Sequence, residues 1–251
     1  MQSEPKVVIV MPTFNEKDSI GRMIDELCSR VFPRVKNHKM ILLVVDDKSP
    51  DGTGKIVKEK MKRCKDLYLL EGEKAGLGAA YTRGFRYAID KLKADAIMEM
   101  DADFQHNPGD VPRFVAEFDK GYDYIIGSRY VSGGSIPEAW GLDRKFFSVA
   151  GNLIYRVSLL MFDIHDFTTG FRLARVKGYL DTINFGKVFS NSFSYKERLL
   201  YEMKKRGAKI KEIPIKFDLR ISGDSKMTTN TVTEQLKIIG VIWADRLGIT
   251  K

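Results

Sequence analysis

The stretch "ILLVVDDKSPDGT", residues 41–53, decides the fold class of this chain. It begins with a run of aliphatic, mostly β-branched residues, which predicts a buried strand. Asp46 and Asp47 end that strand, and residues 49–52 have the composition of a turn. Apolar residues then recur at helical spacing over residues 56–61. A strand, a polar turn and a helix in this order are typical of an α/β protein with a parallel sheet.

The same alternation of strands and helices continues along the chain. We expect strands at the apolar runs "VVIVM" (7–11), "MILLVV" (40–45), "LYLL" (67–70), "AIMEM" (96–100) and "YDYIIG" (122–127). From about Gly127 the pattern changes to helix-like segments at 144–161, 195–206 and 230–247, with one alternating run, "KIKEIPIKF". We therefore predict a mostly parallel sheet flanked by helices in one domain, residues 1–229, followed by an amphipathic helix over residues 230–251.

The composition permits a sizeable core and favours anionic partners. The 251 residues are 43% hydrophobic and carry a formal net charge of +9, which suits phosphates, a nucleic acid or an acidic membrane surface. The N-terminal stretch lacks the features of a signal peptide, and no run approaches the ~18 apolar residues of a membrane-spanning helix. Cys28 and Cys64 have no metal-ligand spacing, so we expect two reduced thiols in a reducing compartment.

Two aspartates in "MDADFQHNP", residues 100–108, predict a cation site. In extended backbone, side chains two residues apart point the same way, so Asp101 and Asp103 can converge. Like charges held together are costly unless a cation lies between them, and carboxylate oxygens suit Mg²⁺ or Mn²⁺. The side-chain oxygen of Gln105 could join them, and a substrate diphosphate could complete the coordination. The alternative interpretation is a solvated turn.

Three other segments are candidate anion or nucleotide sites. Asp46 and Asp47 could accept hydrogen bonds from a ribose or a base, or could simply order an Asx-type turn. "GEKAGLGAAYTRGF" has two glycines before a helix, but lacks the full phosphate-loop and dinucleotide patterns. "FDLRISGDSKM" places Arg220 and Lys226 where they could bind phosphate oxygens, or form a solvated basic loop.

Taken together, the segments resemble the family 2, GT-A-fold glycosyltransferases, and most closely the dolichol-phosphate (polyprenol-phosphate) mannose synthases. The resemblance runs from about Val7 to about Thr228, and its motifs follow the order of that family. They are "PTFNE" (12–16), "VDDKSPDGT" (45–53), "GLGAAYTRGF" (76–85), "MDADFQHNP" (100–108), "GSRYVSGG" (127–134), "RKFFSVAGN" (144–152), "DFTTGFRL" (166–173) and "RISGDSKM" (220–227).

The resemblance implies a Rossmann-like GT-A fold and a role for each matching residue. The implied donor-binding residues are Pro12, Phe14, Glu16, Asp46, Asp47, Asp101, Ala102, Asp103, Gln105 and Arg129. Those implied to bind Mg²⁺ or Mn²⁺ are Asp101, Asp103 and Gln105, and those implied to hold the acceptor phosphate are Arg144, Arg220, Ser225 and Lys226. Asp103, Arg129, Arg220 and Lys226 are the implied catalytic residues.

The implied reaction is an inverting, metal-dependent transfer of mannose from GDP-mannose to dolichyl phosphate, for glycosylation or GPI-anchor pathways. One alternative keeps the fold and acceptor but uses UDP-glucose. Another is a catalytically silent nucleotide-binding scaffold, against which the intact Asp101, Asp103 and Arg220 argue. A nucleic-acid partner is not expected, because no recognised nucleic-acid module is present.

The chain departs from the pattern of that family in ways that bear on localisation. Phe14 stands where the family commonly has tyrosine, and no transmembrane extension follows "DSKM". The chain thus resembles short members, some of which use small membrane-anchoring subunits. We expect a cytoplasmic protein bound peripherally to a membrane, on the cytosolic face of the endoplasmic reticulum in a eukaryote. The apolar residues of 146–162 or of 230–247 would form the contact.

Two further motifs predict structural roles. "SYKE", which begins at Ser194, has the form of a capping box at a helix start, and this favours a capping role for Glu197. His106 and His165 have no partner spacing for metal binding or nucleophilic catalysis, so we expect turn and packing roles for both.

Overall fold

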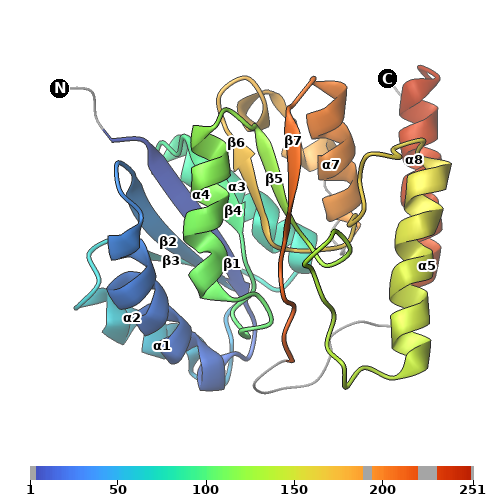
Figure 1. The fold of residues 1–251 in the computed structure, drawn as a ribbon. Coiled ribbons are helices and arrows are strands. Elements are labelled where there is room, and N and C mark those ends of the chain that lie inside the picture. The colour runs from blue at the N-terminus through green and yellow to red at the C-terminus, as the bar shows by residue number, and fades with distance from the viewer. Residues whose placement is uncertain (1–3, 189–193, 220–230, 250–251) are drawn as a thin grey trace.

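The computed structural model describes residues 4–188, 194–219 and 231–249, and its centre is a seven-stranded sheet in the order β3-β2-β1-β4-β6-β5-β7 (Figure 1). The pairs β1–β2, β1–β4, β2–β3 and β5–β7 are parallel, whereas β6 is antiparallel to both of its neighbours. The predicted mostly parallel sheet is therefore confirmed. The strands are β1 (Lys6–Thr13), β2 (Lys39–Asp46), β3 (Leu67–Glu71), β4 (Ala96–Glu99), β5 (Tyr124–Ser128), β6 (Arg172–Arg175) and β7 (Ile210–Pro214).

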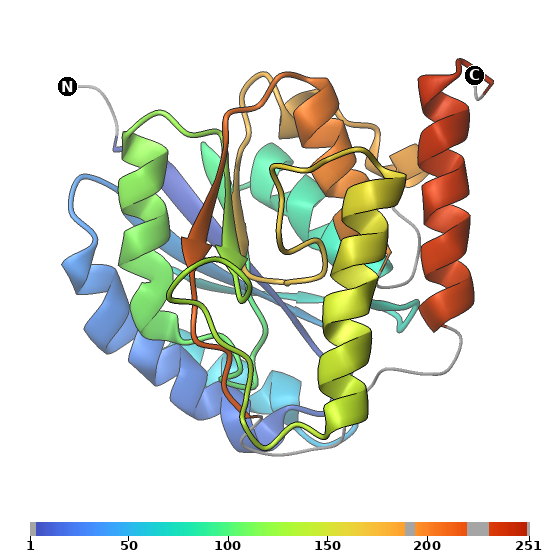
Figure 2. The same cartoon turned by 45° about the vertical axis from the view of Figure 1, so that its right-hand side comes forward.

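Helices cover both faces of the sheet. α1, α2 and α4 lie on one face, and α3, α5, α7 and α8 lie on the other (Figures 1 and 2). The α-helices are α1 (Lys17–Glu26), α2 (Thr53–Met61), α3 (Leu77–Asp90), α4 (Val111–Asp119), α5 (Leu142–Ser158), α6 (Phe185–Val188), α7 (Tyr195–Lys205) and α8 (Thr231–Arg246). Shorter helical turns are η1 (Leu27–Val31), η2 (Phe32–Arg34), η3 (Pro108–Asp110) and η4 (Leu180–Thr182).

The alternation of side chains along β1 divides the interior into two cores. Val7, Ile9 and Met11 point to the face covered by α1, α2 and α4, while Val8 and Val10 point to the opposite face. All five are fully buried, because β1 lies in the middle of the sheet with helices on both sides. This two-sided burial explains why the strand reads as a continuous apolar run.

α5 attaches to the domain through a narrow stripe. The hydroxyls of Ser148 and Tyr130 share a 2.5 Å hydrogen bond. The Asn152 side-chain oxygen accepts the Phe167 backbone N–H at 2.7 Å. One turn later Tyr155 stacks on Phe167 with ring centroids 5.7 Å apart. These positions share one helical face. The opposite face is apolar yet exposed at Leu142, Phe146, Phe147, Val149, Leu153, Ile154 and Val157.

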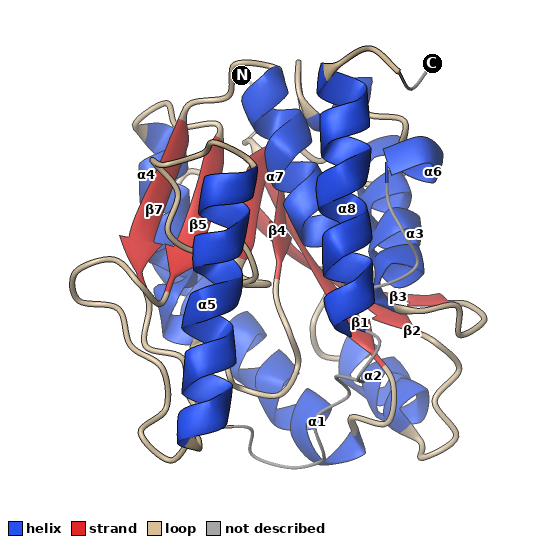
Figure 3. Ribbon diagram, turned by 90° about the vertical axis from the view of Figure 1, so that its right-hand side faces the viewer, coloured by secondary structure: helices blue, strands red, loops and turns tan. Residues whose placement is uncertain are grey.

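α8 lies beside α5 (Figure 3), and the residue colours of Figure 2 show that the two helices run in the same direction. Over residues 236–246 of this helix, Ile238 and Ile242 are buried and join the core on the α7 side of the sheet. The Trp243 indole N–H donates to the Ser158 carbonyl at 2.7 Å, so the C-terminal ends of the two helices meet. Leu236 and Leu247 are exposed. The helix therefore packs against the domain and still presents apolar side chains to solvent.

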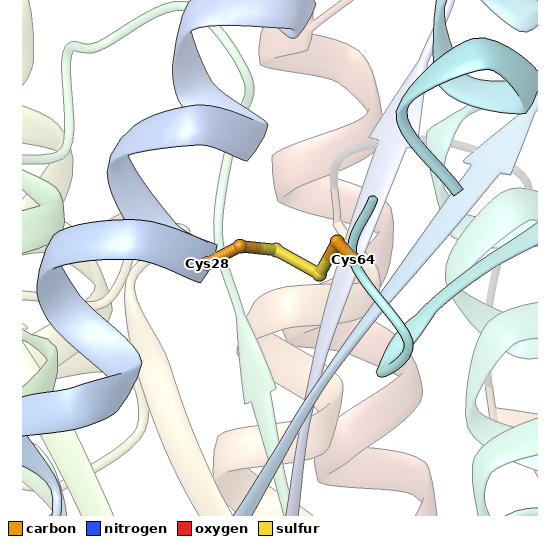
Figure 4. Close-up of a disulfide and its surroundings, with 2 residues drawn as sticks. All are labelled: Cys28 and Cys64. Carbon is orange, nitrogen blue, oxygen red and sulfur yellow. A yellow bond between two sulfur atoms is a disulfide. The ribbon is translucent and has the colours of Figure 1, made fainter. Parts of the chain in front are cut away.

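The prediction of two reduced thiols was wrong. Cys28 and Cys64 form a disulfide that joins η1, the continuation of α1, to the loop after α2 (Figure 4). Their Cα atoms are 6.4 Å apart, within the usual range for a disulfide. The packing of α1 against α2 brings together two cysteines that are 36 residues apart in sequence. Among the described residues, no helix is both long enough and apolar enough to span a bilayer.

Candidate functional site

Most of the predicted donor-binding residues lie at or just after the carboxyl ends of β1, β2 and β4, with β1 between the other two in the sheet, and Arg129 follows β5. Thr13 at the end of β1 is in register with Asp46 at the end of β2. β4 ends at Glu99, two residues before Asp101. Ligands of doubly wound sheets bind outside this edge, where the polar loops follow buried strands.

The loop after β2 orders the loop after β1, which carries "PTFNE". The Ser49 hydroxyl accepts the Asn15 N–H at 3.0 Å, and the Thr53 hydroxyl accepts the Glu16 N–H at 2.9 Å. Asp51 accepts the Lys17 N–H at 3.0 Å. Burial acts to raise the pKa of Asp51, but hydrogen bonds from Thr53 and Lys17 lower it overall. The two loops therefore form one preorganised surface.

The buried side chain of Asp46 links the two loops. Its side chain is 1% exposed and accepts hydrogen bonds from the Thr13 hydroxyl at 2.8 Å, the Ser49 N–H at 2.9 Å and the Ser49 hydroxyl at 2.6 Å. Asp51 accepts the Thr53 N–H two residues on at 3.0 Å, so the Asx-type hydrogen bond of the alternative interpretation is present in this loop. A direct contact between Asp46 and a donor stays a prediction.

Asp47 and Phe14 each lie beside a cation. Asp47 is 8% exposed, and the Arg83 Nη2 is 2.5 Å from its Oδ1. Burial raises the pKa of Asp47, and the hydrogen bond and charge of Arg83 oppose that rise. The Lys74 Nζ lies 3.6 Å from the centroid of the Phe14 ring, in a cation–π contact. Neither Arg83 nor Lys74 has a role implied by the sequence motifs.

The turn after β4 presents Asp101 and Asp103. The Asp101 side chain is 34% exposed, whereas Asp103 is 2% exposed and its Oδ1 accepts the Gln105 N–H at 3.0 Å. Ala102 between them is buried. Phe104 adopts a left-handed conformation, with φ 64°, that turns the chain sharply after Asp103. The paired carboxylates are therefore fixed by a tight turn.

Gln105 ties this turn to a distant segment. Its Nε2 donates to the Asp218 carbonyl at 3.3 Å, and the Asp218 N–H donates to the Gln105 carbonyl at 3.1 Å. Because the side-chain nitrogen is engaged, Oε1 is the atom that a cation would use. Arg220, Ser225 and Lys226 lie in residues 220–230, outside the described residues.

His106 has the structural role that we expected. Its Nδ1 accepts the Asp101 N–H at 3.2 Å, and its ring stacks on Phe171 at 5.0 Å. Burial lowers the pKa of His106 to about 3, so the imidazole is neutral and Nδ1 keeps the lone pair that this hydrogen bond needs. His165 also makes a structural contact, because its Nδ1 lies 2.8 Å from a side-chain oxygen of Glu212.

The residues of the turn fit a hard divalent cation. Asp101, Asp103 and Gln105 offer oxygen atoms, as Mg²⁺ and Mn²⁺ prefer. Within residues 4–188, 194–219 and 231–249, no three His, Cys, Asp or Glu side chains gather at one point where a metal could bind. A cation held here would therefore need oxygen ligands from a bound diphosphate and water to complete its coordination.

Arg129 forms a buried ion pair. Its Nε and Nη2 donate to the two carboxylate oxygens of Asp166 at 2.7 Å each, and Nη2 also donates to the Thr168 hydroxyl at 2.6 Å. Burial acts to raise the pKa of Asp166, but the charge and hydrogen bonds of Arg129 lower it overall. A direct contact between Arg129 and a substrate stays a prediction. Arg144 lies near the start of α5, with its guanidinium 3.9 Å from the Trp140 ring centroid.

A buried polar cluster behind the site was not predicted. Arg172 on β6 is fully buried and donates to the Tyr124 hydroxyl at 3.0 Å and to the Lys196 carbonyl at 2.7 Å. Glu99 accepts the Tyr195 hydroxyl at 2.6 Å. Glu197 also belongs here, because it is 4% exposed and burial raises its pKa to about 7.

The capping-box prediction at "SYKE" was wrong. Ser194 is the N-cap residue of α7, but its side chain makes no capping hydrogen bond. Ser194 has helical backbone angles, φ −70° and ψ −2°, instead of the extended conformation of a typical N-cap residue. Glu197 points into the buried cluster, so tertiary contacts override the local motif.

Comparisons with known proteins identify the family. Residues 8–181 match the model of glycosyl transferase family 2. The chain is 34% identical over 233 residues to a polyprenol monophosphomannose synthase of Mycolicibacterium smegmatis, covering 92% of this chain and 84% of that protein. It is also 34% identical over 230 residues to an undecaprenyl-phosphate mannosyltransferase of Micrococcus luteus, covering 91% of this chain and 90% of that protein.

A solved structure confirms the fold class. The chain resembles glucosyl-3-phosphoglycerate synthase from Mycobacterium tuberculosis, solved with Mn²⁺, UDP and glucosyl-3-phosphoglycerate, with a TM-score of 0.65 and 17% identity. The match covers 98% of this chain and 81% of that one. The shared architecture is the GT-A fold. With the family match and the mannosyltransferase relatives, it establishes that this chain belongs to glycosyl transferase family 2 and is a glycosyltransferase.

Proposed function

We propose that the enzyme transfers mannose from GDP-mannose to a polyprenyl phosphate of the dolichyl or undecaprenyl type. The observation that carries this proposal is the turn with Asp101 and Asp103 at the carboxyl end of β4, in a chain that is 34% identical to polyprenyl-phosphate mannose synthases. That turn lies beside the ordered loops after β1 and β2, where a nucleoside would bind. The donor would thus extend along the sheet edge from Asp47 to Asp103.

Asp101, Asp103 and Gln105 would hold the divalent cation, which supplies positive charge to the leaving diphosphate when bound. Asp103 is oriented by the Gln105 N–H at 3.0 Å, and Asp101 is oriented through its backbone by His106. These hydrogen bonds restrain the turn that carries the two carboxylates before a cation binds. Such preorganisation lowers the free-energy cost of stabilising charge in the transition state.

The acceptor needs no protein base. A phosphate monoester has a second pKa of ~6, so it is largely dianionic at neutral pH and already nucleophilic. Arg144, Arg220, Ser225 and Lys226 would bind this phosphate and align it behind the anomeric carbon. A single displacement would invert the configuration at that carbon, from an α-linked donor to a β-linked product.

The apolar outer face of α5 would lie on the membrane that contains the acceptor. Phe146 and Phe147 are 68% and 70% exposed, although phenylalanine is usually buried. Arg144 and Lys145 flank them, a combination that suits an interface with anionic lipids. α8 adds the exposed Leu236 and Leu247 beside it. We infer a peripheral association, in which small anchoring subunits could assist.

The test uses the purified protein with Mn²⁺ or Mg²⁺, a polyprenyl phosphate in detergent, and radiolabelled GDP-mannose or UDP-glucose in parallel. The proposal predicts label in the organic phase with GDP-mannose and none with UDP-glucose. Label from UDP-glucose alone would replace the donor assignment. Absence of metal-dependent nucleotide binding would contradict the proposal as a whole.

A further inference from the structure

Lys196 lies in the first turn of α7 and is 7% exposed, although lysine is rarely buried. Its backbone carbonyl accepts the Arg172 Nη1 at 2.7 Å, which fastens the start of α7 to β6. Arg172 is in register with Glu99, the last residue of β4. The start of α7 therefore lies beside the carboxyl end of the strand that leads to Asp101.

Gly170 provides the space for the Lys196 ammonium group. A Cβ atom at position 170 would lie 2.8 Å from the Lys196 Nζ and 3.4 Å from Cε1 of His106. The ammonium and the imidazole therefore border the same small space. On its other side the His106 ring reaches Asp101, because its Nδ1 accepts the Asp101 N–H at 3.2 Å and lies 3.6 Å from Oδ2. One imidazole ring thus connects the surroundings of the ammonium to a predicted metal ligand.

The charge of Lys196 acts on the same turn. Burial is the main cause that lowers the pKa of His106, the charge of Asp103 opposes this effect, and the charge of Lys196 adds to it. Both charged groups therefore lie near the ring. Among the described residues, the buried Oε1 of Glu99 and Oε2 of Glu197 accept no hydrogen bond. The Lys196 ammonium therefore does not bind either of these two oxygens, although both belong to the buried cluster behind the site.

A fixed positive charge behind two carboxylates affects a free cation and a metal–nucleotide complex in opposite ways. It lowers the affinity for free Mn²⁺, because like charges repel. It raises the affinity for the Mn²⁺–GDP complex, whose net charge is negative. Within the described residues no third His, Cys, Asp or Glu side chain joins Asp101 and Asp103 at one point, so a cation there depends on diphosphate oxygens.

We propose that Lys196 is a positioning residue that makes the turn with Asp101 and Asp103 select a metal–diphosphate complex over the free cation. Its ammonium offsets the repulsion between the two carboxylates while no metal is bound, and it attracts the diphosphate that brings the metal. Lys196 acts through the electric field at the turn and does not need to touch the substrate. This inference rests on the proposed function, because it takes these aspartates to bind the cation of a nucleoside diphosphate sugar.

The experiment measures two dissociation constants, that of free Mn²⁺ by electron paramagnetic resonance and that of the preformed Mn²⁺–GDP complex by calorimetry. Lys196→Met keeps the length of the side chain and removes its charge. We expect this variant to bind free Mn²⁺ about threefold to tenfold more tightly than the wild type, and Mn²⁺–GDP about threefold to tenfold more weakly. A purely structural role would weaken both, so the opposite signs identify the effect of charge.

Gly170→Ala is a second test variant, because its Cβ would displace the Lys196 Nζ without removing the lysine. Both dissociation constants should shift in the same directions as in Lys196→Met, by smaller factors. Lys204→Met is the matched control. It removes the same unit charge from the same helix, at a partly exposed lysine that pairs with Asp163, and should change each constant by less than about twofold.

Weaker binding of both free Mn²⁺ and Mn²⁺–GDP to Lys196→Met would overturn the inference, because Lys196 would then act through the folding of the turn. Unchanged constants would also overturn it. Thermal unfolding of each variant is measured first, and if Lys196→Met does not fold, Gly170→Ala decides by the same criteria. All these outcomes leave the proposed function intact if the wild type binds Mn²⁺–GDP. A wild type that binds no nucleotide with metal would overturn the proposed function and this inference together.

Discussion

Gln105 and Asp218 bind each other reciprocally, with the Gln105 amide group donating to the Asp218 carbonyl and the Asp218 N–H donating to the Gln105 carbonyl. The two residues are 113 positions apart, and the contact fastens the segment before Arg220 to the turn that carries Asp101 and Asp103. These two hydrogen bonds therefore connect the proposed metal site to the segment that leads to the proposed acceptor-binding residues.

Replacing Gln105 with methionine should raise the KM for the donor while lowering the free energy of unfolding only slightly. The change removes one hydrogen bond, with a cost of about 1 kcal/mol in the free energy of unfolding, and removes the predicted metal ligand. Asn107→Ala is the control, because Asn107 also makes one hydrogen bond in this turn, to the Gly109 N–H at 2.8 Å. The measurement compares the KM for the donor in both variants. An equal KM in the two would remove Gln105 from the donor site.

Asp166→Ala should destabilise the protein severely. It would leave the Arg129 guanidinium buried without its carboxylate, for which the expected loss is about 3–5 kcal/mol in the free energy of unfolding. Asp163→Ala removes the exposed partner of Lys204 and should change stability by no more than about 0.5 kcal/mol. Urea unfolding measures both. If both substitutions lower the free energy of unfolding by similar small amounts, the Arg129–Asp166 pair contributes no more to stability than an exposed pair.

Glu197→Gln should reduce the pH dependence of stability. Burial raises the pKa of Glu197 from 4.5 to about 7, so the folded state holds this proton more tightly than the unfolded state does. The stability that protonation provides is complete below pH 4.5 and is lost as the pH rises to about 7. The wild type should therefore lose up to about 3 kcal/mol more than Glu197→Gln does between those limits.

Unfolding free energies at intervals from pH 4 to 8 test this, with Glu59→Gln at an exposed position as the control. Parallel curves for the wild type and Glu197→Gln would contradict the assignment of Glu197 to a desolvated, protonated state near neutral pH.

The double variant Phe146→Ser, Phe147→Ser should bind membranes weakly without losing stability. Both rings are mostly exposed in the protein, so their removal costs little packing, whereas insertion of each ring into a bilayer contributes about 1.5–3 kcal/mol. Flotation with vesicles of neutral and anionic phospholipids should show more than a tenfold drop in binding. Met61→Ser on α2, at 38% exposure, is the control. Equal flotation of the wild type and the double variant would move the contact from α5 to α8.

Strand ends and the paired aspartates were predictable because they depend on local patterns. β1, β2 and β4 read as apolar runs since they are buried on both faces, and the polar residues that follow them must lie at one edge of a parallel sheet. β6 was missed because its sequence, "RLAR", begins and ends with arginine. Arg172 is buried only because Tyr124 and the Phe167 and Lys196 carbonyls accept its hydrogen bonds.

The other differences also arise from tertiary contacts. The sequence separation of Cys28 and Cys64 does not show that α1 packs on α2 and brings them together. Asp47 was expected from its position after a strand, yet its partner Arg83 follows 36 residues later on a helix, and Gly72 makes room for it. Short motifs therefore located the candidate site, while the partners of its charged groups required the folded structure.

The most direct test of the central claim compares the wild type with Asp103→Asn in the transfer of label from GDP-[¹⁴C]mannose to polyprenyl phosphate, with Mn²⁺ and with excess EDTA. The asparagine can still accept the Gln105 N–H, so the turn should remain folded while the charge that would bind the cation is lost. We predict metal-dependent mannolipid from the wild type, none with EDTA, and at least about a hundredfold less from Asp103→Asn. Undiminished transfer by Asp103→Asn, or by the wild type in EDTA, would contradict the account.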